Sequence, residues 1–236
     1  FLFRGRMDER YDTVRAVRDG RFRYVRNYSP HRPWGQHYSY PFQVLPSMRS
    51  WHAEFLAGRC NEAQAAYWKP KLAEEFYQIA GDPFELRNLI AQPQHAADVA
   101  RLRAALRAEI LAARDTGFIP EGMIPNLAGD KTIYDYAHSD AYPIERILDL
   151  ADMASDGKPA NLPALIAALD DPHPVVRYWA ATGCLILRDK AAPAKAKLLE
   201  RLTDDWVDVR VVAAEAVAHV GEQEAAIKTL GEVLTS

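Results

Sequence analysis

Two stretches of this sequence align with each other, LDDPHPVVR at residues 169–177 and LTDDWVDVR at residues 202–210. The same offset of 33 residues places Leu165 over Leu198, and an alanine pair at 180–181 over a second pair at 213–214. A repeat of this length built from paired helices is typical of a solenoid, in which each unit buries its apolar face against its neighbours. The sequence therefore predicts an all-α, HEAT-like solenoid over residues 144–236.

Each predicted unit consists of a helix, a turn that carries an aspartate, and a second helix whose alanines allow close approach of its neighbours. Residues 227–234 begin a third unit that the sequence does not finish, so the last repeat is incomplete. A preceding helix of the same layer is predicted by apolar residues at helical spacing, Ile144, Ile147, Leu148 and Ala151.

Charged residues recur at equivalent places in the two units. Asp171 is followed by Arg177, and Asp204 by Arg210. We expect the aspartates to cap the second helix of each unit and to form ion pairs from one unit to the next.

The first half of the chain differs in character, being rich in aromatic residues, arginine and turn-forming residues. Asp19-Gly20 within residues 12–28 indicates a β-hairpin. A three-residue loop with Gly20 in the left-handed conformation gives one apolar face but sets Arg15 opposite Arg23. A two-residue turn avoids that clash, yet it mixes apolar and charged residues on both faces. We predict the three-residue loop.

Further elements follow the hairpin. The Pro-, Tyr- and His-rich residues 29–51 predict a long ordered loop, and residues 75–79 predict a short strand. Asp82 as N-cap with Glu85 three residues later predicts a short helix that ends at Asn88. A helix at 95–114 is indicated by an apolar stripe, Val99, Leu102, Leu106 and Ile110. The predicted fold class is α+β: a small antiparallel sheet with a packing helix at 1–119, a linker at 120–143, and the solenoid at 144–236.

Composition restricts the classes of partner. Apolar residues make up 49% of the chain and the formal net charge is -3, so no overall positive field attracts nucleic acid or an anionic membrane. No run approaches the roughly 18 apolar residues that a membrane-spanning helix needs. Cys60 and Cys184 are the only cysteines and lie in separate predicted domains, which favours neither a disulfide nor a thiolate metal cluster.

Three stretches resemble the C-terminal subdomain of the sulfatase family, and their order carries more weight than any one of them. The first runs through RMDERY at 6–11 into VRAVRDGRFRYVRNY at 14–28. The second, EFYQIAGDPFELRNL at 75–89, is similar to the family's E-L-Y-D-L-x-x-D-P-x-E-x-x-N-L, from which it departs at Phe76, Gln78 and Ile79. The third, ARDTGFIPEG at 113–122, resembles the exit segment of bacterial sulfatases that carry HEAT-like repeats.

The resemblance implies a parent enzyme that hydrolyses sulfate esters, or sulfamates in one branch. It also implies a formylglycine made from the first residue of a C/S-x-P-S-R motif, a divalent cation, usually Ca²⁺, and an extracytoplasmic location. Cys60 is followed by NEA and Cys184 by LIL, so neither cysteine fits that motif. We therefore expect the nucleophile and the metal ligands in an absent N-terminal catalytic domain that is this chain's partner, and we expect no catalytic residue, metal or cofactor here.

Candidate substrate-binding residues lie in two segments. The loop at 31–37 combines imidazole, guanidinium and indole groups suited to contacting a sugar or aryl ring, although a structural loop is the plainer interpretation. The residues before the hairpin are candidates by resemblance, with surface ion pairs as the alternative. The candidates are Arg4, Arg6, Asp8, His31, Arg32 and His37.

The arginines of the hairpin are a separate case. They are either anion contacts or solvent-facing residues that protect a strand edge, namely Arg15, Arg18, Arg21, Arg23 and Arg26.

Two functions follow as hypotheses. The chain is the C-terminal portion of a sulfatase, completing its fold and its substrate rim, and is inactive on its own. The alternative is a non-catalytic interaction module whose HEAT-like repeats bind another protein or self-associate.

Overall fold

The structure is a computed structural model that describes residues 1–235, and it divides into two compact units. The first comprises residues 1–110 and contains the sheet, and the second begins at Leu111 and is helical. The predicted fold class, a small antiparallel sheet followed by HEAT-like helices, is confirmed. The domain boundaries at 119 and 143 stay a prediction.

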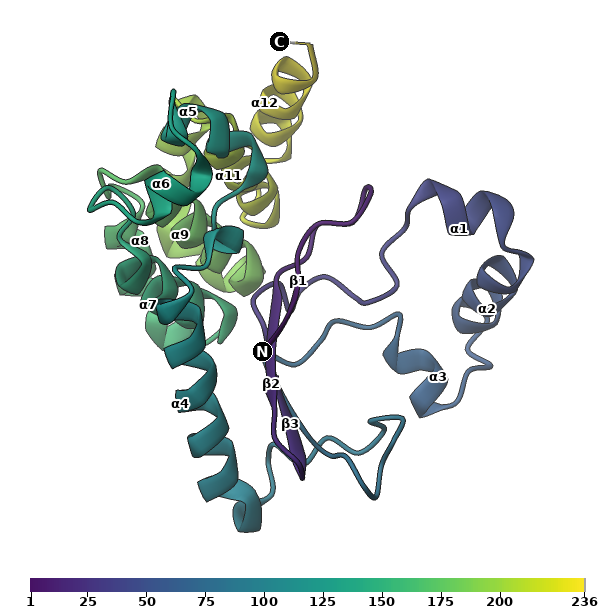
Figure 1. Ribbon diagram of the computed structural model, residues 1–236. Coiled ribbons are helices and arrows are strands. Elements are labelled where there is room, and N and C mark those ends of the chain that lie inside the picture. Colours follow the sequence, from purple (N-terminus) through teal and green to yellow (C-terminus); the bar gives the residue numbers. More distant parts are fainter. Residues whose placement is uncertain (236) are drawn as a thin grey trace. The chain divides into compact units, whose positions relative to one another are not determined.

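The sheet of the first unit has four antiparallel strands in the order β1-β2-β3-β4 (Figure 1). The strands are β1 (Leu2–Arg4), β2 (Val14–Arg18), β3 (Phe22–Asn27) and β4 (Glu74–Gln78). Strand β4 matches the strand predicted at 75–79 to within one residue. Long segments connect β1 to β2 and β3 to β4, so the sheet holds together residues that are far apart in the sequence.

The predicted register of the β2–β3 hairpin is wrong. In the structure Arg15 lies opposite Arg26 rather than Arg23, and Gly20 does not adopt a positive φ. The side chain of Asp19 decides the turn, because its Oδ1 accepts the backbone N–H groups of Arg21 (2.7 Å) and Phe22 (2.8 Å). A carboxylate that satisfies the turn amides makes a left-handed glycine unnecessary.

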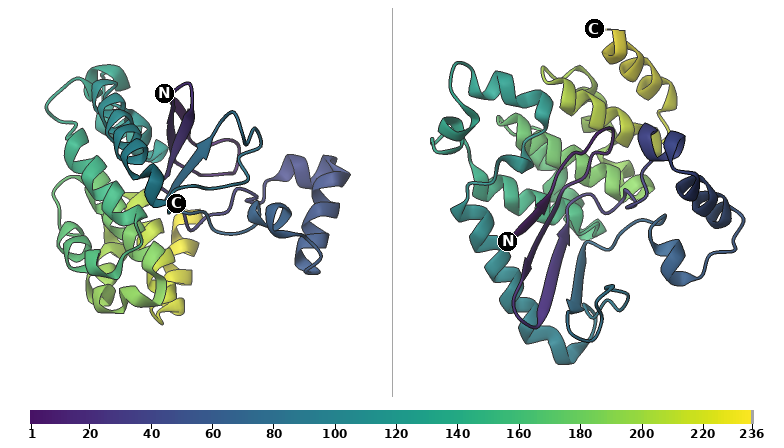
Figure 2. Two further views of the ribbon diagram at one scale, coloured as in Figure 1. Left: turned by 90° about the horizontal axis from the view of Figure 1, so that it is seen from below. Right: turned by 45° about the vertical axis from the view of Figure 1, so that its right-hand side comes forward.

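Helix α4 (Ala96–Ala112) covers one face of this sheet (Figures 1 and 2). It buries the predicted apolar stripe, so the helix predicted at 95–114 is confirmed. Phe22 and Phe76 stack on the same face with ring centroids 4.8 Å apart, and the ring of His95, which ends η1 (Pro93–His95), packs against both. Phe22 and Phe76 are buried, so their rings belong to the core of this unit.

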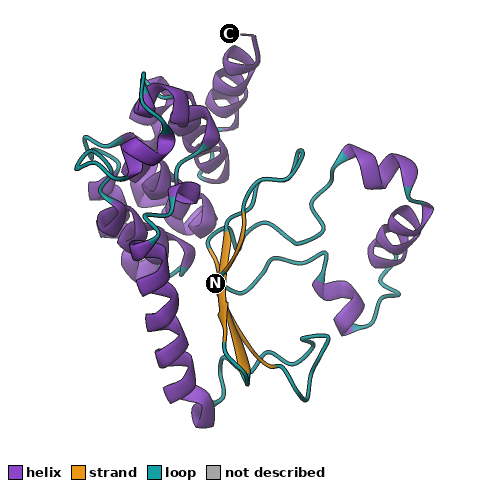
Figure 3. Cartoon of the chain, in the orientation of Figure 1, coloured by secondary structure: helices purple, strands orange, loops and turns teal. Residues whose placement is uncertain are grey.

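The loop predicted at 29–51 is too long, because more than half of these residues are helical. It is irregular only to residue 38, and then forms α1 (Ser39–Val44) and α2 (Pro46–Leu56). Proline does not prevent these helices, because Pro46 occupies the first position of α2 and Pro41 lies in the first turn of α1, where no helical N–H bond is required. With α3 (Glu62–Ala66), these helices lie beyond extended connections from the sheet (Figure 3).

The helix predicted after Asp82 is absent from the described chain. Asp82 accepts the N–H groups of Leu86 (3.0 Å) and Arg87 (2.7 Å) instead, and Glu85 adopts φ 55°. This left-handed residue is strained, and its carboxylate pairs with Arg23 at 2.6 Å. The turn brings the Asn88 side chain to the N–H of Phe76 at 2.9 Å, which covers the outer edge of β4.

The second unit consists of short connecting helices and stacked helix pairs. Residues 115–137 form η2 (Thr116–Phe118), η3 (Glu121–Met123), α5 (Ile124–Ala128) and α6 (Ile133–Ala137). The stacked helices are α7 (Ile144–Ser155), α8 (Leu162–Ala168), α9 (Pro174–Leu187), α10 (Lys195–Glu200), α11 (Val207–His219) and α12 (Gln223–Thr235). Turns of 3-10 helix separate them at η4 (Pro159–Asn161), η5 (Arg188–Ala194) and η6 (Arg201–Thr203).

Small residues allow these helices to pack closely, as the repeat predicted. The helices α7, α9, α11 and α12 pack in succession, and the alanine pairs of α9 and α11 are fully buried. Gly183 in α9 lies so close to Leu165 of α8 that an added Cβ would be 2.7 Å from a leucine methyl group. The four residues predicted for the preceding helix are all buried in α7.

Candidate functional site

Two of the segments that carry candidate residues lie side by side in the first unit. Residues 5–11 form a small turn, closed by mutual backbone hydrogen bonds of Met7 and Arg10, that contacts the loop at 34–39. The guanidinium of Arg10 lies 4.2 Å from the ring centroid of Tyr38. Gln36 donates to the carbonyl oxygen of Tyr11 at 3.3 Å. The structure thus forms one continuous surface from two segments that the sequence separates.

The first three candidates occupy different positions on this surface. Arg4 ends β1, and its guanidinium lies 5.0 Å from the ring centroid of Trp34. Arg6 and Asp8 are exposed in the turn, where Arg6 donates to the carbonyl oxygen of Asp8 at 2.9 Å and Asp8 has φ 49°. Arg4 is therefore built into the fold, whereas the other two project from it.

The three candidates of the loop at 31–37 are not gathered at one point. Arg32 donates to Nε2 of the adjacent His31 at 3.3 Å, and both side chains are half-buried. His37 is exposed and packs against Phe42 of α1, with ring centroids 4.4 Å apart. The loop therefore presents two separate groups, one formed by His31 with Arg32 and one beside α1.

A buried ion pair that sequence reasoning missed supports this loop. Lys71 Nζ contacts both carboxylate oxygens of Asp12, at 2.6 and 2.7 Å, and the two side chains are 1% and 0% exposed. The same Nζ lies 4.5 Å from the ring centroid of Trp34. Burial lowers the pKa of Lys71, although the nearby Asp12 opposes that shift. No sequence pattern predicts this pair, because 59 residues separate its members.

A second polar group lies at the centre of the same face. Asn27 donates to Oε1 of Glu75 at 2.7 Å, and the hydroxyl of Tyr77 donates to its Oε2 at 2.9 Å. Burial, followed by the charge of Glu75, raises the pKa of Tyr77, so this hydroxyl stays protonated. The carboxylate of Glu75 is thus held by neutral donors and fixes the β3–β4 pairing.

The structure separates the hairpin arginines into buried and exposed ones. Arg15 and Arg26 are buried rather than solvent-facing, at 2% and 4% exposure. Arg15 Nη1 donates to the backbone carbonyl oxygens of Val14 (2.9 Å) and Arg4 (3.2 Å). Buried Arg15, with its backbone acceptors, serves the fold. Arg18 and Arg21 are exposed, but they lie at the turn between two central strands and do not protect a sheet edge.

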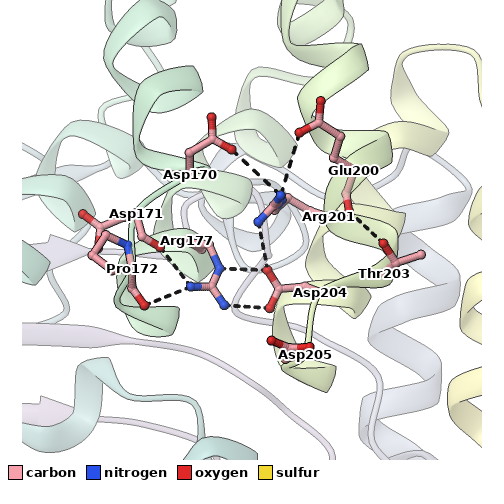
Figure 4. Close-up of a pocket in the computed structure, with 9 residues that line it drawn as sticks. All are labelled: Asp170, Asp171, Pro172, Arg177, Glu200, Arg201, Thr203, Asp204 and Asp205. Carbon is pink, nitrogen blue, oxygen red and sulfur yellow. Dashed lines mark hydrogen bonds and ion pairs between the residues drawn. The ribbon is translucent and has the colours of Figure 1, made fainter.

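In the second unit, charged residues line a cavity of about 350 Å³ between the turns of successive repeats (Figure 4). Arg177 makes a two-bond ion pair with Asp204, with both nitrogen–oxygen distances 2.8 Å. Arg201 lies among Asp170, Glu200 and Asp204 (Figure 4). Both guanidinium groups are therefore neutralised within the cavity, which is the joint between repeats.

The predicted ion pairs between units are confirmed and form a regular series. Arg146 pairs with Asp171 at 2.8 Å, and Arg177 of the next helix pairs with Asp204 of the next turn. Burial raises the pKa of Asp204, but hydrogen bonds from Arg177 and the backbone outweigh it and hold that pKa below the usual range.

The predicted capping of the second helices needs correction. Asp171 accepts the N–H of His173 at 2.7 Å, and Asp204 that of Trp206 at 3.1 Å. These acceptors bond the residue before the helix rather than its first turn.

The formylglycine and calcium ion implied by the resemblance do not fit the residues present. Within residues 1–235, no group of three or more His, Cys, Asp or Glu side chains is arranged to hold a metal ion. Cys184 is fully buried, and burial raises its thiol pKa to about 12. Within the same range, no helix has the length and apolar character needed to cross a membrane.

Two comparisons with known proteins match parts of this chain. A family model for HEAT repeats matches residues 132–218. The chain is also similar to an ulvan-active sulfatase from Formosa agariphila, with 34% identity over 122 residues. That match covers 51% of this chain but 20% of the relative, so the chain spans about a fifth of the length of the sulfatase that it matches. No solved structure matches the chain.

Proposed function

We propose that this chain is the C-terminal portion of a formylglycine-dependent sulfatase that hydrolyses sulfate esters or sulfamates. The observation that carries the proposal is the 34% identity to an ulvan-active sulfatase over half the chain. The sheet backed by a long helix is the C-terminal subdomain in this proposal, and its partner is the catalytic domain that holds formylglycine and a divalent cation such as Ca²⁺. The proposed location of the parent is extracytoplasmic.

The role of the first unit in this proposal is to complete the substrate rim. Arg4, the turn at residues 5–11 and the loop at 31–39 support this role, since they combine fixed and projecting cationic groups. Arg4 and Arg32 are suited to paired hydrogen bonds with a sulfate or carboxylate, and His31 and His37 to single ones. Arg6 and Asp8 project from the turn, where they would contact the more distant parts of a substrate.

The coding sequence upstream of Phe1 provides the first test. A C/S-x-P-S-R motif in the same reading frame is expected, and a parent gene without it ends the proposal. In the parent enzyme, His31→Ala and Arg32→Ala should lower kcat/KM for a sulfated saccharide, whereas Arg87→Ala, at an exposed position of the first unit, should not. The present chain alone should release no sulfate from 4-nitrophenyl sulfate, and turnover by pure material would refute the assignment of its residues.

A second candidate function is a HEAT-repeat interaction module. It is favoured by Arg210, the last arginine in the series of ion pairs between repeats. Arg210 donates to the carbonyl oxygen of Asp204 at 2.8 Å, as Arg177 does to that of Asp171. Within residues 1–235, however, Arg210 has no carboxylate partner, and nearby α12 exposes Ile227 and Leu234. Light scattering and pull-down with the chain and an Arg210→Glu variant test this function, and a strictly monomeric, partnerless chain would contradict it.

A further inference from the structure

A cavity of about 210 Å³ lies on the face of the sheet opposite α4. Its floor is formed by Val14, Ala16 and Val25, and the ring of Trp34 packs against these residues. Sites for drug-sized molecules occupy roughly 300–1,000 Å³, and one water takes up ~30 Å³ in the liquid. The cavity is therefore suited to a molecule of about the size of a substituted benzene.

Two guanidinium groups line this cavity at opposite ends of its apolar floor. Arg4 pairs with Val14 in the β1–β2 register, and Arg23 pairs with Arg18 in the β2–β3 register. Val14 and Arg18 lie four residues apart on β2, a separation of ~13 Å along the strand. A ligand over Ala16 thus lies between the two charges and within reach of either.

The two charges are not compensated equally. Arg23 is paired with Glu85 at 2.6 Å, and the neighbouring Lys71 is paired with Asp12. Arg4 has no carboxylate partner within residues 1–235, and its Nη2 is shielded from solvent without a hydrogen-bond acceptor. A shielded cationic donor without an acceptor is costly, and an incoming anion recovers that cost through a charge-assisted hydrogen bond.

We propose that this cavity binds a small organic monoanion whose oxyanion head pairs with Arg4 and whose apolar body covers Ala16 and Val25. The ligand needs a charged head because Arg4 lies at one end of the cavity, and it needs an apolar body because the floor is apolar. This inference shares Arg4 with the proposed substrate rim, but it goes beyond the proposed function, because it concerns binding by this chain alone and holds whether or not the parent hydrolyses sulfate esters.

The test is isothermal titration calorimetry of the full chain with benzenesulfonate, beside two matched probes. Benzenesulfonamide keeps the apolar body without the charge, and inorganic sulfate keeps the oxyanion without the body. Saturable binding of benzenesulfonate, at least about tenfold tighter than either probe, is expected. Absence of saturable benzenesulfonate binding, or equal affinity for either probe, overturns the proposal.

Two variants place the binding in the cavity. Arg4→Leu removes the charge and should weaken benzenesulfonate binding at least about tenfold. Ala16→Leu fills the floor without altering any charge and should weaken it similarly. Arg87→Leu, which removes an exposed arginine from the same unit, should bind like the wild type. Circular dichroism and thermal unfolding check that each variant is folded. Unchanged affinity in either folded cavity variant refutes the assignment.

Discussion

Lys71→Met tests whether the buried ion pair with Asp12 supports the first unit. The replacement keeps the length of the side chain but leaves the carboxylate of Asp12 buried, and among residues 1–235 the remaining donor is the Thr13 N–H at 2.9 Å. Removing one partner of a buried pair costs ~3–5 kcal/mol, which is a large part of the ~5–15 kcal/mol that holds a typical domain folded. We therefore expect the first unit of this variant to be close to its unfolding threshold.

Urea unfolding followed by tryptophan fluorescence measures the effect, because Trp34 lies beside Lys71. The double variant Asp12→Leu/Lys71→Met should recover most of the loss, since neither buried charge then remains. Arg59→Met, which breaks the exposed pair with Glu54, is the matched control and should leave the midpoint unchanged. Two results would refute the reasoning. One is a loss in the free energy of unfolding under ~1 kcal/mol for Lys71→Met. The other is a loss in the double variant as large as the losses of Asp12→Leu and Lys71→Met added together.

Three further predictions concern pH, packing and thiol reactivity. Hydrogen bonds from the amides of Phe22 and Arg21, and then from Arg101, lower the pKa of Asp19 to about 2. The ionised carboxylate therefore stabilises the fold fully above about pH 4, and this contribution is lost toward pH 2. The difference in thermal midpoint between wild type and Asp19→Ala should shrink over that interval. Gly183→Ala should lower the thermal midpoint, because the new methyl group would clash with Leu165 and Ala154. Overpacking of this kind costs ~1–3 kcal/mol, which exceeds the ~1 kcal/mol gain in helix propensity. A higher midpoint would contradict this packing. In the folded chain a thiol-specific disulfide reagent should label the partly exposed Cys60 and not the buried Cys184, and rapid labelling of both under native conditions would contradict the assigned burial.

Part of the candidate surface was predictable from residue types alone. Trp34 and its neighbours form an aromatic, cationic loop in which regular structure is excluded by proline, and the structure keeps that loop irregular to residue 38. Arg4 was a candidate only through resemblance. Its importance in the structure comes from Trp34 and the cavity, which depend on three strands being brought together. Lys71 carried no signal at all, because a lone lysine in a turn-rich segment resembles any exposed lysine.

Two of the errors, the hairpin register and the helix after Asp82, share one cause, which is competition between side chains and the backbone for the same hydrogen bonds. Asp19 and Asp82 both accept backbone amides in the structure, and each thereby selects a turn other than the predicted one. Which amides a carboxylate reaches depends on the surrounding chain, so the residue type alone does not decide it. Pro41 and Pro46 led to a different error, in which helices were predicted as loop. A helix tolerates proline in its first turn, so these residues do not exclude α1 and α2.

The sequence by itself determined the periodic features: the repeat of 33 residues, the stripe of α4 and the alternation that makes strands. These depend on local spacing, since residues three or four apart share a helix face and alternate residues share a strand face. Only the tertiary structure decided the strand register, the Asp12–Lys71 pair and which charged residues pair across the repeats, such as Arg177 with Asp204. Such contacts join residues far apart in the chain, and their energy depends on burial, which exists only once the core has formed.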